Sequence, residues 1–426
     1  MKFRATPFAL LLALAAAAPA ETLDLDQVVR RASDNAWSMR EADVSARQAR
    51  SDLAVARAQR GLSLTADAGH RASQHPFVRR DVSQVTSVGL NASLPLYTGG
   101  SVSAKIERSE ALAAKSEASK EESRRAVAAE AVSLYLSFFE WTDEISWREQ
   151  SVEACDSSLS RTRALFEAGR ALESDTLLAA SDCAGERDAL VSARDASEEI
   201  LRSLRQLTGL EPSAELVLAP VDTAEIDRIE LPESLEELIR EIEAASPQAK
   251  ADSLQLAAAQ ASLRAAGARV QVNLSASAST GIDWTPDDYG EELENQYVHS
   301  VSLGITIPLL DRGAIAGSVE SARLAREQAL ISRERNARTL RDDVETLWRA
   351  LRLDLAKKPS ADLSLRAAEQ SYLRAQEKQK LGELSYSDLL QEKTSFDSAR
   401  LSRQRLRWSL LENSIRLRIL RGAYGR

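Results

Sequence analysis

The sequence repeats its own outline in its second half, and this duplication limits the folds that the chain can adopt. The stretch "SLPLYTGG" begins at Ser93, and "TIPLLDRG" begins at Thr306. At the same spacing Gly169 matches Gly382. A period of this length is far longer than the repeat of a solenoid, so it indicates two copies of one domain half. Each half is predicted to run helix, strand, strand, long helix, turn and long helix.

Alternating apolar and polar residues indicate two β-strands in each half. Before the first proline of the quoted stretches, for example, Val88, Leu90 and Leu94 alternate with polar or small residues. The predicted strands cover residues 62–72, 85–97, 271–284 and 297–310. Strands of about 10–12 residues can cross the hydrocarbon layer of a membrane when they are tilted.

A single strand of this kind would equally suit a soluble sandwich with one wet face. Four strands cannot close a barrel by themselves, however, and an open sheet edge in lipid leaves backbone groups unpaired. We therefore expect several subunits to share one membrane barrel. The predicted fold class is mainly helical, with a membrane β-barrel to which each chain contributes four strands.

Long helical patterns follow both strand pairs. They run over residues 101–168 and 314–381, and at 1.5 Å per residue each helix is on the order of 100 Å long. Each is expected to turn back into a second helix, so that helical hairpins cover residues 101–208 and 314–421. A 4-3-4 spacing of apolar residues predicts a coiled-coil seam in both long helices, formed by Val127, Ala131, Leu134 and Phe138 and by Leu340, Val344, Leu347 and Leu351. Pro359 is expected to interrupt the second long helix and kink it.

Proline and glycine residues mark the change from strand to helix. Pro95 and Pro308 lack the N–H group that a strand ladder needs, and Gly100 and Gly313 permit a turn into a helix. We interpret these four residues as the joints between the sheet and the helices.

The ends of the repeats predict the domain organisation. Residues 1–20 combine basic residues, an apolar run and a small-residue cleavage site, and are expected to be a signal peptide. A first repeat is expected at 21–210, a connecting segment at 211–234 and a second repeat at 235–426.

Composition and motifs argue against several classes of function. The chain has 55 Lys and Arg residues against 64 Asp and Glu residues, a net charge of −9, and an acidic chain is a poor candidate for binding nucleic acid. No Cys-x-x-Cys pair, nucleophile elbow or phosphate loop occurs in the sequence. His299 is in phase with the apolar face of a strand, where an interfacial role is expected rather than a ligand role. We therefore expect no enzyme activity, no cofactor and no metal site.

The two cysteines, Cys155 and Cys183, lie equally far from Gly169 in the sequence, one before it and one after it. They should therefore sit at comparable heights on the two arms of the first helical hairpin. Packed helices lie about 8–10 Å apart, however, which is beyond the ordinary reach of a disulfide. A disulfide and two free thiols both stay open.

Four stretches of the sequence are similar to the TolC-type outer-membrane efflux family. They are the two joints "SLPLYTGG" and "TIPLLDRG" and the two hairpin turns "LFEAGRALESDTL" and "KLGELSYSDLLQEKTSFDSARL". The resemblance implies a homotrimer in the outer membrane of a Gram-negative bacterium. Three chains would form a twelve-stranded β-barrel in the lipid, continued by an α-helical barrel in the periplasm.

The resemblance also implies a function and partners. Such a channel exports small molecules or polypeptides together with a periplasmic adaptor and an inner-membrane transporter. The alternative is a periplasmic coiled-coil scaffold that transports nothing and whose sheet only mediates assembly.

Several site residues follow from the resemblance. Asp388 and Asp175 are expected to line a pore constriction, although both positions also suit helix N-terminal caps. A second acidic position of the family holds Gln391 here, and the position of a basic latch residue holds Leu384. The hairpin tips that meet the adaptor are expected to include four residues, which could otherwise be simple helix ends: Gly169, Gly382, Ala168 and Leu381.

Overall fold

The computed structural model describes residues 21–74, 82–221, 223–231, 234–268, 272–286, 293–308 and 310–422. The predicted signal peptide lies outside the described residues. The chain forms two compact units: unit 1 contains Met1–Trp37, Arg125–Glu233 and Thr346–Arg426, and unit 2 contains Ser38–Arg124 and Ser234–Glu345. The predicted order of helix, strands and paired long helices is found in both halves of the sequence.

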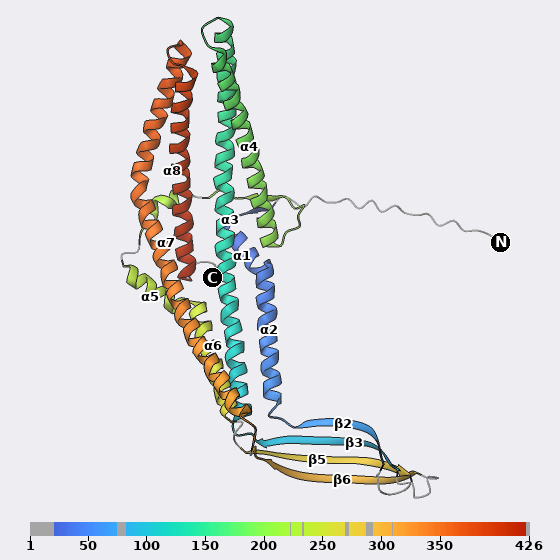
Figure 1. The fold of residues 1–426 in the computed structure, drawn as a ribbon. Helices are drawn as coiled ribbons and strands as arrows, with labels where there is room; N and C mark the ends of the chain where they lie inside the picture. The colour runs from blue at the N-terminus through green and yellow to red at the C-terminus, as the bar shows by residue number, and fades with distance from the viewer. Residues whose placement is uncertain are drawn as a thin grey trace, which may run out of the picture. The chain divides into compact units, whose positions relative to one another are not determined.

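Unit 2 contains an antiparallel sheet of four strands in the order β2-β3-β5-β6 (Figure 1). The strands are β2 (Ser63–Gln74), β3 (Val82–Tyr97), β5 (Asn273–Pro286) and β6 (Leu293–Thr306). The two central strands, β3 and β5, come from different halves of the duplication and pair over most of their length. The sheet therefore joins the two halves of the sequence along its middle, and β2 and β6 form its edges.

The sheet has one polar and one apolar face. Serine side chains on the polar face form cross-strand hydrogen bonds, such as Ser277 with Ser302 at 2.7 Å and Ser279 with Ser300 at 2.8 Å. Large apolar side chains on the other face are exposed: Val88, Leu90, Val301, Leu303 and Ile305. His299 lies on this apolar face, and its Nδ1 is 2.8 Å from the hydroxyl of Thr280 on the neighbouring strand.

The joints use left-handed backbone conformations. Gly100 has a φ of 85° and Gly313 a φ of 86°, a region that glycine adopts without steric cost. The preceding residue is also left-handed at both joints, with a φ of 61° at Gly99 and 53° at Arg312. Two successive left-handed residues therefore make each turn from strand to helix.

The two prolines of the joints differ. Pro308 follows the end of β6, as expected, but Pro95 lies inside β3, which continues to Tyr97 after an irregularity in register. The expectation that Pro95 ends the ladder is therefore wrong. The pairing of β2 with β3 ends at Ser93, so β3 has a single neighbour at Pro95.

Three helices and the first parts of two others accompany the sheet in unit 2. They are α2 (Trp37–Ala58), α5 (Leu235–Ala245), α6 (Pro247–Gly267) and the first parts of α3 (Ser101–Glu167) and α7 (Ala314–Leu381). They pack through small side chains and polar contacts, such as the ion pair of Lys120 with Asp43 at 2.6 Å. Two helices precede the strands of each half. In the first half α1 ends at Asn35, before α2 begins, and in the second half α5 ends before Ser246, which caps α6.

Unit 1 contains the second parts of α3 and α7 with α1 (Leu25–Asn35), α4 (Glu173–Thr208) and α8 (Tyr386–Leu420). The connecting segment adds strand β4 (Leu216–Leu218), which pairs with β1 (Glu21–Leu23), and the 3-10 helix η1 (Thr223–Arg228). The buried Tyr135 of α3 donates its hydroxyl to the carbonyl oxygen of Ala219 at 2.5 Å and so anchors this segment.

The long helix α7 continues without a break through Pro359. The predicted interruption at this residue is therefore wrong, whereas the predicted kink stays a prediction. Among the described helices, none is both long and apolar enough to span a membrane.

Candidate functional site at the hairpin tips

The two helical hairpins of unit 1 end in glycine turns of the same design. Gly169 after α3 has a φ of 68°, and Gly382 after α7 a φ of 75°. The residue after each glycine donates its N–H to a carbonyl five residues back, Arg170 to Leu165 at 2.8 Å and Glu383 to Lys378 at 2.9 Å, which is the Schellman pattern of a helix end. The glycines are therefore required by the left-handed backbone.

The structure brings the two tips together. A Cβ atom on Gly382 would lie 3.3 Å from Nη2 of Arg170 on the other hairpin. Both turns line one depression of about 420 Å³, with Leu172, Asp175, Leu384 and Ser385 on its wall. Two of the sequence-predicted tip residues, Gly169 and Gly382, thus share one site, whereas Ala168 and Leu381 do not line the depression.

Asp388 and Asp175 occupy equivalent positions in the first turns of α8 and α4. The carboxylate of Asp388 accepts the hydroxyl of Ser385 at 2.7 Å, and the same hydroxyl oxygen accepts the N–H of Asp388 at 3.2 Å. The carboxylate of Asp175 accepts the N–H of Leu172 at 3.2 Å. Both acids therefore stabilise a helix N-terminus, as the capping alternative expected. Asp388 is exposed and Asp175 is half-buried, so both carboxylates also reach solvent.

Leu384, at the family's basic latch position, packs into an apolar cluster. This cluster contains Ala179 of α4, Ala375 of α7, and Tyr386 and Leu389 of α8. Apolar packing therefore joins the two hairpins where the resemblance implies a charged contact. Gln391 is exposed on α8.

Cys155 on α3 and Cys183 on α4 are joined by a disulfide, with their Cα atoms 5.4 Å apart. Because Cα atoms lie about 2.3 Å from the axis of a helix, facing Cα atoms at this separation fit the usual spacing of about 8–10 Å between packed helix axes, and that spacing does not put a disulfide out of reach. Both cysteines are buried.

A buried ion network, which the sequence did not predict, lies further along the hairpins. Nζ of Lys393 on α8 is 2.9 Å from Asp182 and 2.8 Å from Glu186, both on α4. Arg148 on α3 bridges Glu186 at 2.9 Å and Glu144 at 2.8 Å. In the sequence these residues look like the solvated i, i+4 pairs of any surface helix.

Burial and the charges of this network shift the pKa values of nearby acids. Burial would raise the pKa of Glu186, but hydrogen bonds from Lys393 and Arg148 outweigh it and hold this pKa below its ordinary value. Burial raises the pKa of Asp397 on α8 to about 6, and the charges of Lys393 and Arg148 offset only part of this effect.

One group of side chains in the described part of the chain has metal-ligand chemistry: Cys155, Asp156 and Cys183. The two sulfur atoms are bonded to each other, and Asp156 pairs with Arg187 at 2.6 Å. The donors are thus engaged within the protein.

A comparison with protein-family models gives one match, "Outer membrane efflux protein", over residues 28–210 and 238–423. The chain belongs to the outer membrane efflux protein family. One matched segment lies in each half of the sequence. The resemblance inferred from the joints and hairpin turns is thereby confirmed.

Solved structures of outer-membrane channels have the same fold. The CmeC channel of Campylobacter jejuni is 16% identical, with a TM-score of 0.80 over 94% of this chain and 86% of that chain. VceC of Vibrio cholerae is 15% identical, with a TM-score of 0.78 over 94% and 97%. The open state of the MtrE channel of Neisseria gonorrhoeae is 18% identical, with a TM-score of 0.77 over 94% and 90%. A comparison with curated protein sequences gives no match.

Membership of the outer membrane efflux protein family establishes the general function. The protein is an export channel of the Gram-negative outer membrane that extends into the periplasm, and its family consists of channels rather than enzymes. The family works in tripartite systems and forms trimers. The alternative of a scaffold without transport is not favoured.

Proposed function

We propose that three copies of this chain form one channel, with a twelve-stranded barrel in the outer membrane and a helical tunnel below it. The channel exports small molecules or polypeptides that an inner-membrane transporter delivers through a periplasmic adaptor. It performs no chemistry of its own.

The observation that carries this proposal is the two-faced sheet with its two edges. The apolar face exposes Val301 at 88% and Leu303 at 65% of their surface, which suits contact with lipid. The opposite face carries serine hydroxyls that suit an aqueous lumen. Because lipid cannot satisfy the backbone groups of an edge strand, β2 of one copy must pair with β6 of the next.

Within this channel, Asp388 and Asp175 form acidic rings at the narrow periplasmic end. Three symmetry-related carboxylates in a narrow pore favour cations and repel anions. The capping contact of each carboxylate is compatible with this role, because a carboxylate has lone pairs beyond those used in the cap. The absence of a second acid at Gln391 makes Asp388 the main charge of its ring.

The hairpin tips at Gly169 and Gly382, with Ala168 and Leu381, are the docking surface for the adaptor. The depression between the two turns supports this assignment, since it presents backbone and side chains of both hairpins together.

A pair of matched substitutions tests the channel. Val301→Asp places a charge on the apolar face of β6, whereas Ser302→Asp places the same charge on the polar face. A charge on the lipid face is destabilising: Arg or Lys costs about 2–4 kcal/mol at the centre of a membrane barrel, and Asp costs less. We expect Val301→Asp to abolish heat-resistant trimers in the outer-membrane fraction and Ser302→Asp to preserve them. The proposal would be contradicted if the two variants formed the same amount of heat-resistant trimer. It would also be contradicted if a salt wash released the wild-type protein from the membrane.

A further inference from the structure

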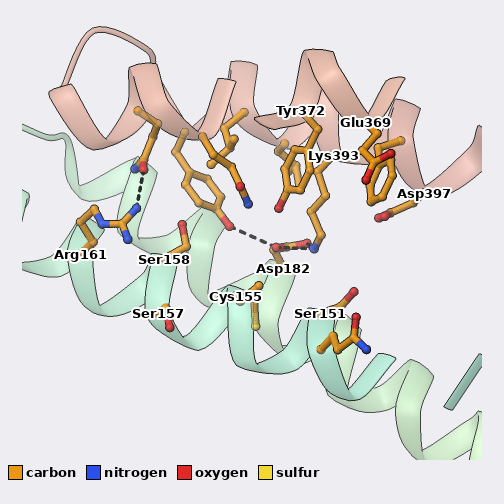
Figure 2. Close-up of a pocket in the computed structure, with 18 of the residues that line it drawn as sticks. Ser151, Cys155, Ser157, Ser158, Arg161, Asp182, Glu369, Tyr372, Lys393 and Asp397 are labelled. Atoms are coloured by element: carbon orange, nitrogen blue, oxygen red, sulfur yellow. Dashed lines mark hydrogen bonds and ion pairs between the residues drawn. The ribbon is translucent and has the colours of Figure 1, made fainter. Parts of the chain in front are cut away.

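A cavity of about 490 Å³ lies between the helical hairpins of unit 1 (Figure 2). Its wall includes residues of all four hairpin helices, α3, α4, α7 and α8, and every one of these residues belongs to unit 1. Gln150 on α3 and Glu369 on α7 are wall residues that are exposed, so the cavity is reached from solvent at its rim. Its volume is in the range of cavities that bind small molecules.

Aromatic side chains form the apolar part of the wall. The rings of Tyr372 on α7 and Phe396 on α8 are stacked, with their centroids 5.5 Å apart and 12° between their planes. Trp147 on α3 is 4% exposed, and the guanidinium of Arg400 lies 5.1 Å from the centroid of its ring. Aromatic faces attract cations. The wall thus already holds one cationic group against a ring.

The buried ion network beside the cavity contains more acids than bases. Lys393 pairs with Asp182 and Glu186. Arg148 pairs with Glu186 and Glu144, so three carboxylates share two bases. The Oε2 atom of Glu144 is buried and has no hydrogen-bond partner in the described part of the chain. Buried carboxylates are unfavourable without a compensating positive charge.

Asp397 adds a further acid on the cavity wall. It follows Lys393 by one turn of α8, and it forms no hydrogen bond or ion pair with any described residue. Burial raises its pKa to about 6, and the charges of Lys393 and Arg148 offset only part of this effect. The carboxyl is therefore largely ionised at neutral pH. Glu369 and Arg400, which also line the cavity, add one acid and one base and leave this excess unchanged.

The remaining basic residues of the wall do not supply the missing positive charge. Lys380 pairs with Glu377 of its own helix at 2.6 Å. Arg161 donates to the side chain of Gln379 at 3.2 Å, and Figure 2 shows Arg161 at the opposite end of the cavity from Asp397. Uncompensated negative charge therefore lies next to the aromatic rings.

We propose that this cavity binds an organic cation, a small amine that carries an aromatic ring. The ammonium group pairs with Asp397, and the ring packs against Phe396 and Tyr372. The ligand supplies the positive charge that this part of the wall lacks, and the aromatic side chains select it over an inorganic cation. The site lies in the wall of the hairpins and does not depend on conduction through the proposed channel.

Isothermal titration calorimetry on the purified full chain at neutral pH tests the site with three probes that share an indole ring. Tryptamine carries an ammonium group, tryptophol a hydroxyl and indole-3-acetate a carboxylate. We expect tryptamine to bind about tenfold more tightly than tryptophol or better, because a hydrogen bond between charged groups is roughly twice as strong as one between neutral groups. Indole-3-acetate should not bind, since the excess charge of the site is negative.

Matched substitutions locate the site. Asp397→Asn keeps the shape of the side chain and removes its charge, and we expect the affinity for tryptamine to fall about tenfold or more while that for tryptophol stays the same. Phe396→Leu keeps an apolar side chain and removes the ring, which should weaken tryptamine by about threefold or more. Asp195→Asn, at an exposed position of α4, is the control and should bind tryptamine like the wild type.

Several outcomes would overturn this site, and none of them bears on membrane insertion or conduction. They are a wild type that does not bind tryptamine, equal affinities for tryptamine and tryptophol, and an Asp397→Asn variant with wild-type affinity for tryptamine. Methylammonium that binds as tightly as tryptamine would also overturn it, because the rings would then play no part. Should Asp397→Asn not assemble, the three probes on the wild type together with Phe396→Leu decide.

Discussion

Gly89 on β3 lies directly opposite Gly281 on β5, at the point where the two halves of the duplication meet in the sheet. A Cβ atom on Gly281 would lie 2.8 Å from the carbonyl oxygen of Val88 and 3.1 Å from Cα of Gly89. The first of these distances is too short for any side chain unless the backbone shifts. The close approach of the two central strands therefore depends on glycine.

Substitution of Gly281 should disturb the sheet. We expect Gly281→Val to destabilise the assembled barrel by about 1–3 kcal/mol, as overpacking does, and to lower the temperature at which trimers dissociate on gels. Gly304→Val in β6 is the control, because a Cβ there meets no atom closer than 3.6 Å. A Gly281→Val trimer as heat-resistant as the Gly304→Val trimer would show that the strands adjust freely.

The pH dependence of stability should report on Asp397. Its pKa is raised by burial to about 6, above the ordinary value of about 3.9. The folded protein therefore binds this proton more tightly than the unfolded chain. The resulting stabilisation is fully present below about pH 4 and is lost as the pH rises through about 6.

Asp397→Asn should remove this part of the pH profile. We expect the difference in Tm between wild type and variant to change across pH 4 to 7, with the wild type losing stability relative to the variant as the pH rises. Asp195→Asn, at an exposed position of α4, is the control. A Tm difference between wild type and Asp397→Asn that stays constant with pH would contradict the raised pKa of Asp397.

The Cys155–Cys183 bridge should be present in the exported protein and should stabilise it. A disulfide that closes a loop with a sequence separation of 28 residues is expected to contribute about 3–4 kcal/mol. The double variant Cys155→Ala, Cys183→Ala should therefore have a lower Tm. Mass spectrometry under non-reducing conditions should find no free thiol, and two free thiols would refute the bridge.

Asp388 should control ion selectivity. Asp388→Asn keeps the hydroxyl cap that Ser385 supplies to the first turn of α8 but removes one charge from each chain of the trimer. We expect the ratio of cation to anion permeability to fall by roughly twofold or more. Gln391→Asp should raise the same ratio, because it adds an acid further along α8. Unchanged selectivity in both variants would leave Asp388 with its capping role alone.

The backbone of the turns was largely predictable from the sequence. Every residue with a positive φ in the described part of the chain belongs to one of four pairs that share the spacing of the duplication: Gly99 and Arg312, Gly100 and Gly313, Gly169 and Gly382, and Gly209 and Gly422. Glycine in a duplicated sequence therefore located the joints and the hairpin ends. Arg312 is the exception, because an arginine does not itself indicate a left-handed backbone; only the glycine at the equivalent position of the first half, Gly99, predicts it.

The buried charges were not predictable. Lys393 and Asp182 are 211 residues apart in sequence, and each lies on a helix rich in charged residues. The few apolar residues of each helix do not indicate which of its charged side chains the other hairpin will bury. For the same reason, the sequence did not indicate that Leu384 and Tyr386 would share one apolar cluster with Ala179.

The strand order β2-β3-β5-β6 also has a consequence for symmetry. In the proposed ring, β3 meets β5 within a chain and β6 meets β2 between chains, so each boundary joins the later strand of one β-hairpin to the earlier strand of the next. A ring of six identical half-chains would close with the same pairing. Fusing two halves into one polypeptide reduces that sixfold arrangement to threefold. The two halves can then carry different residues, so an ion pair such as Lys393 with Asp182 can form at the boundary between the two hairpins of one chain and be absent at the boundary between neighbouring chains.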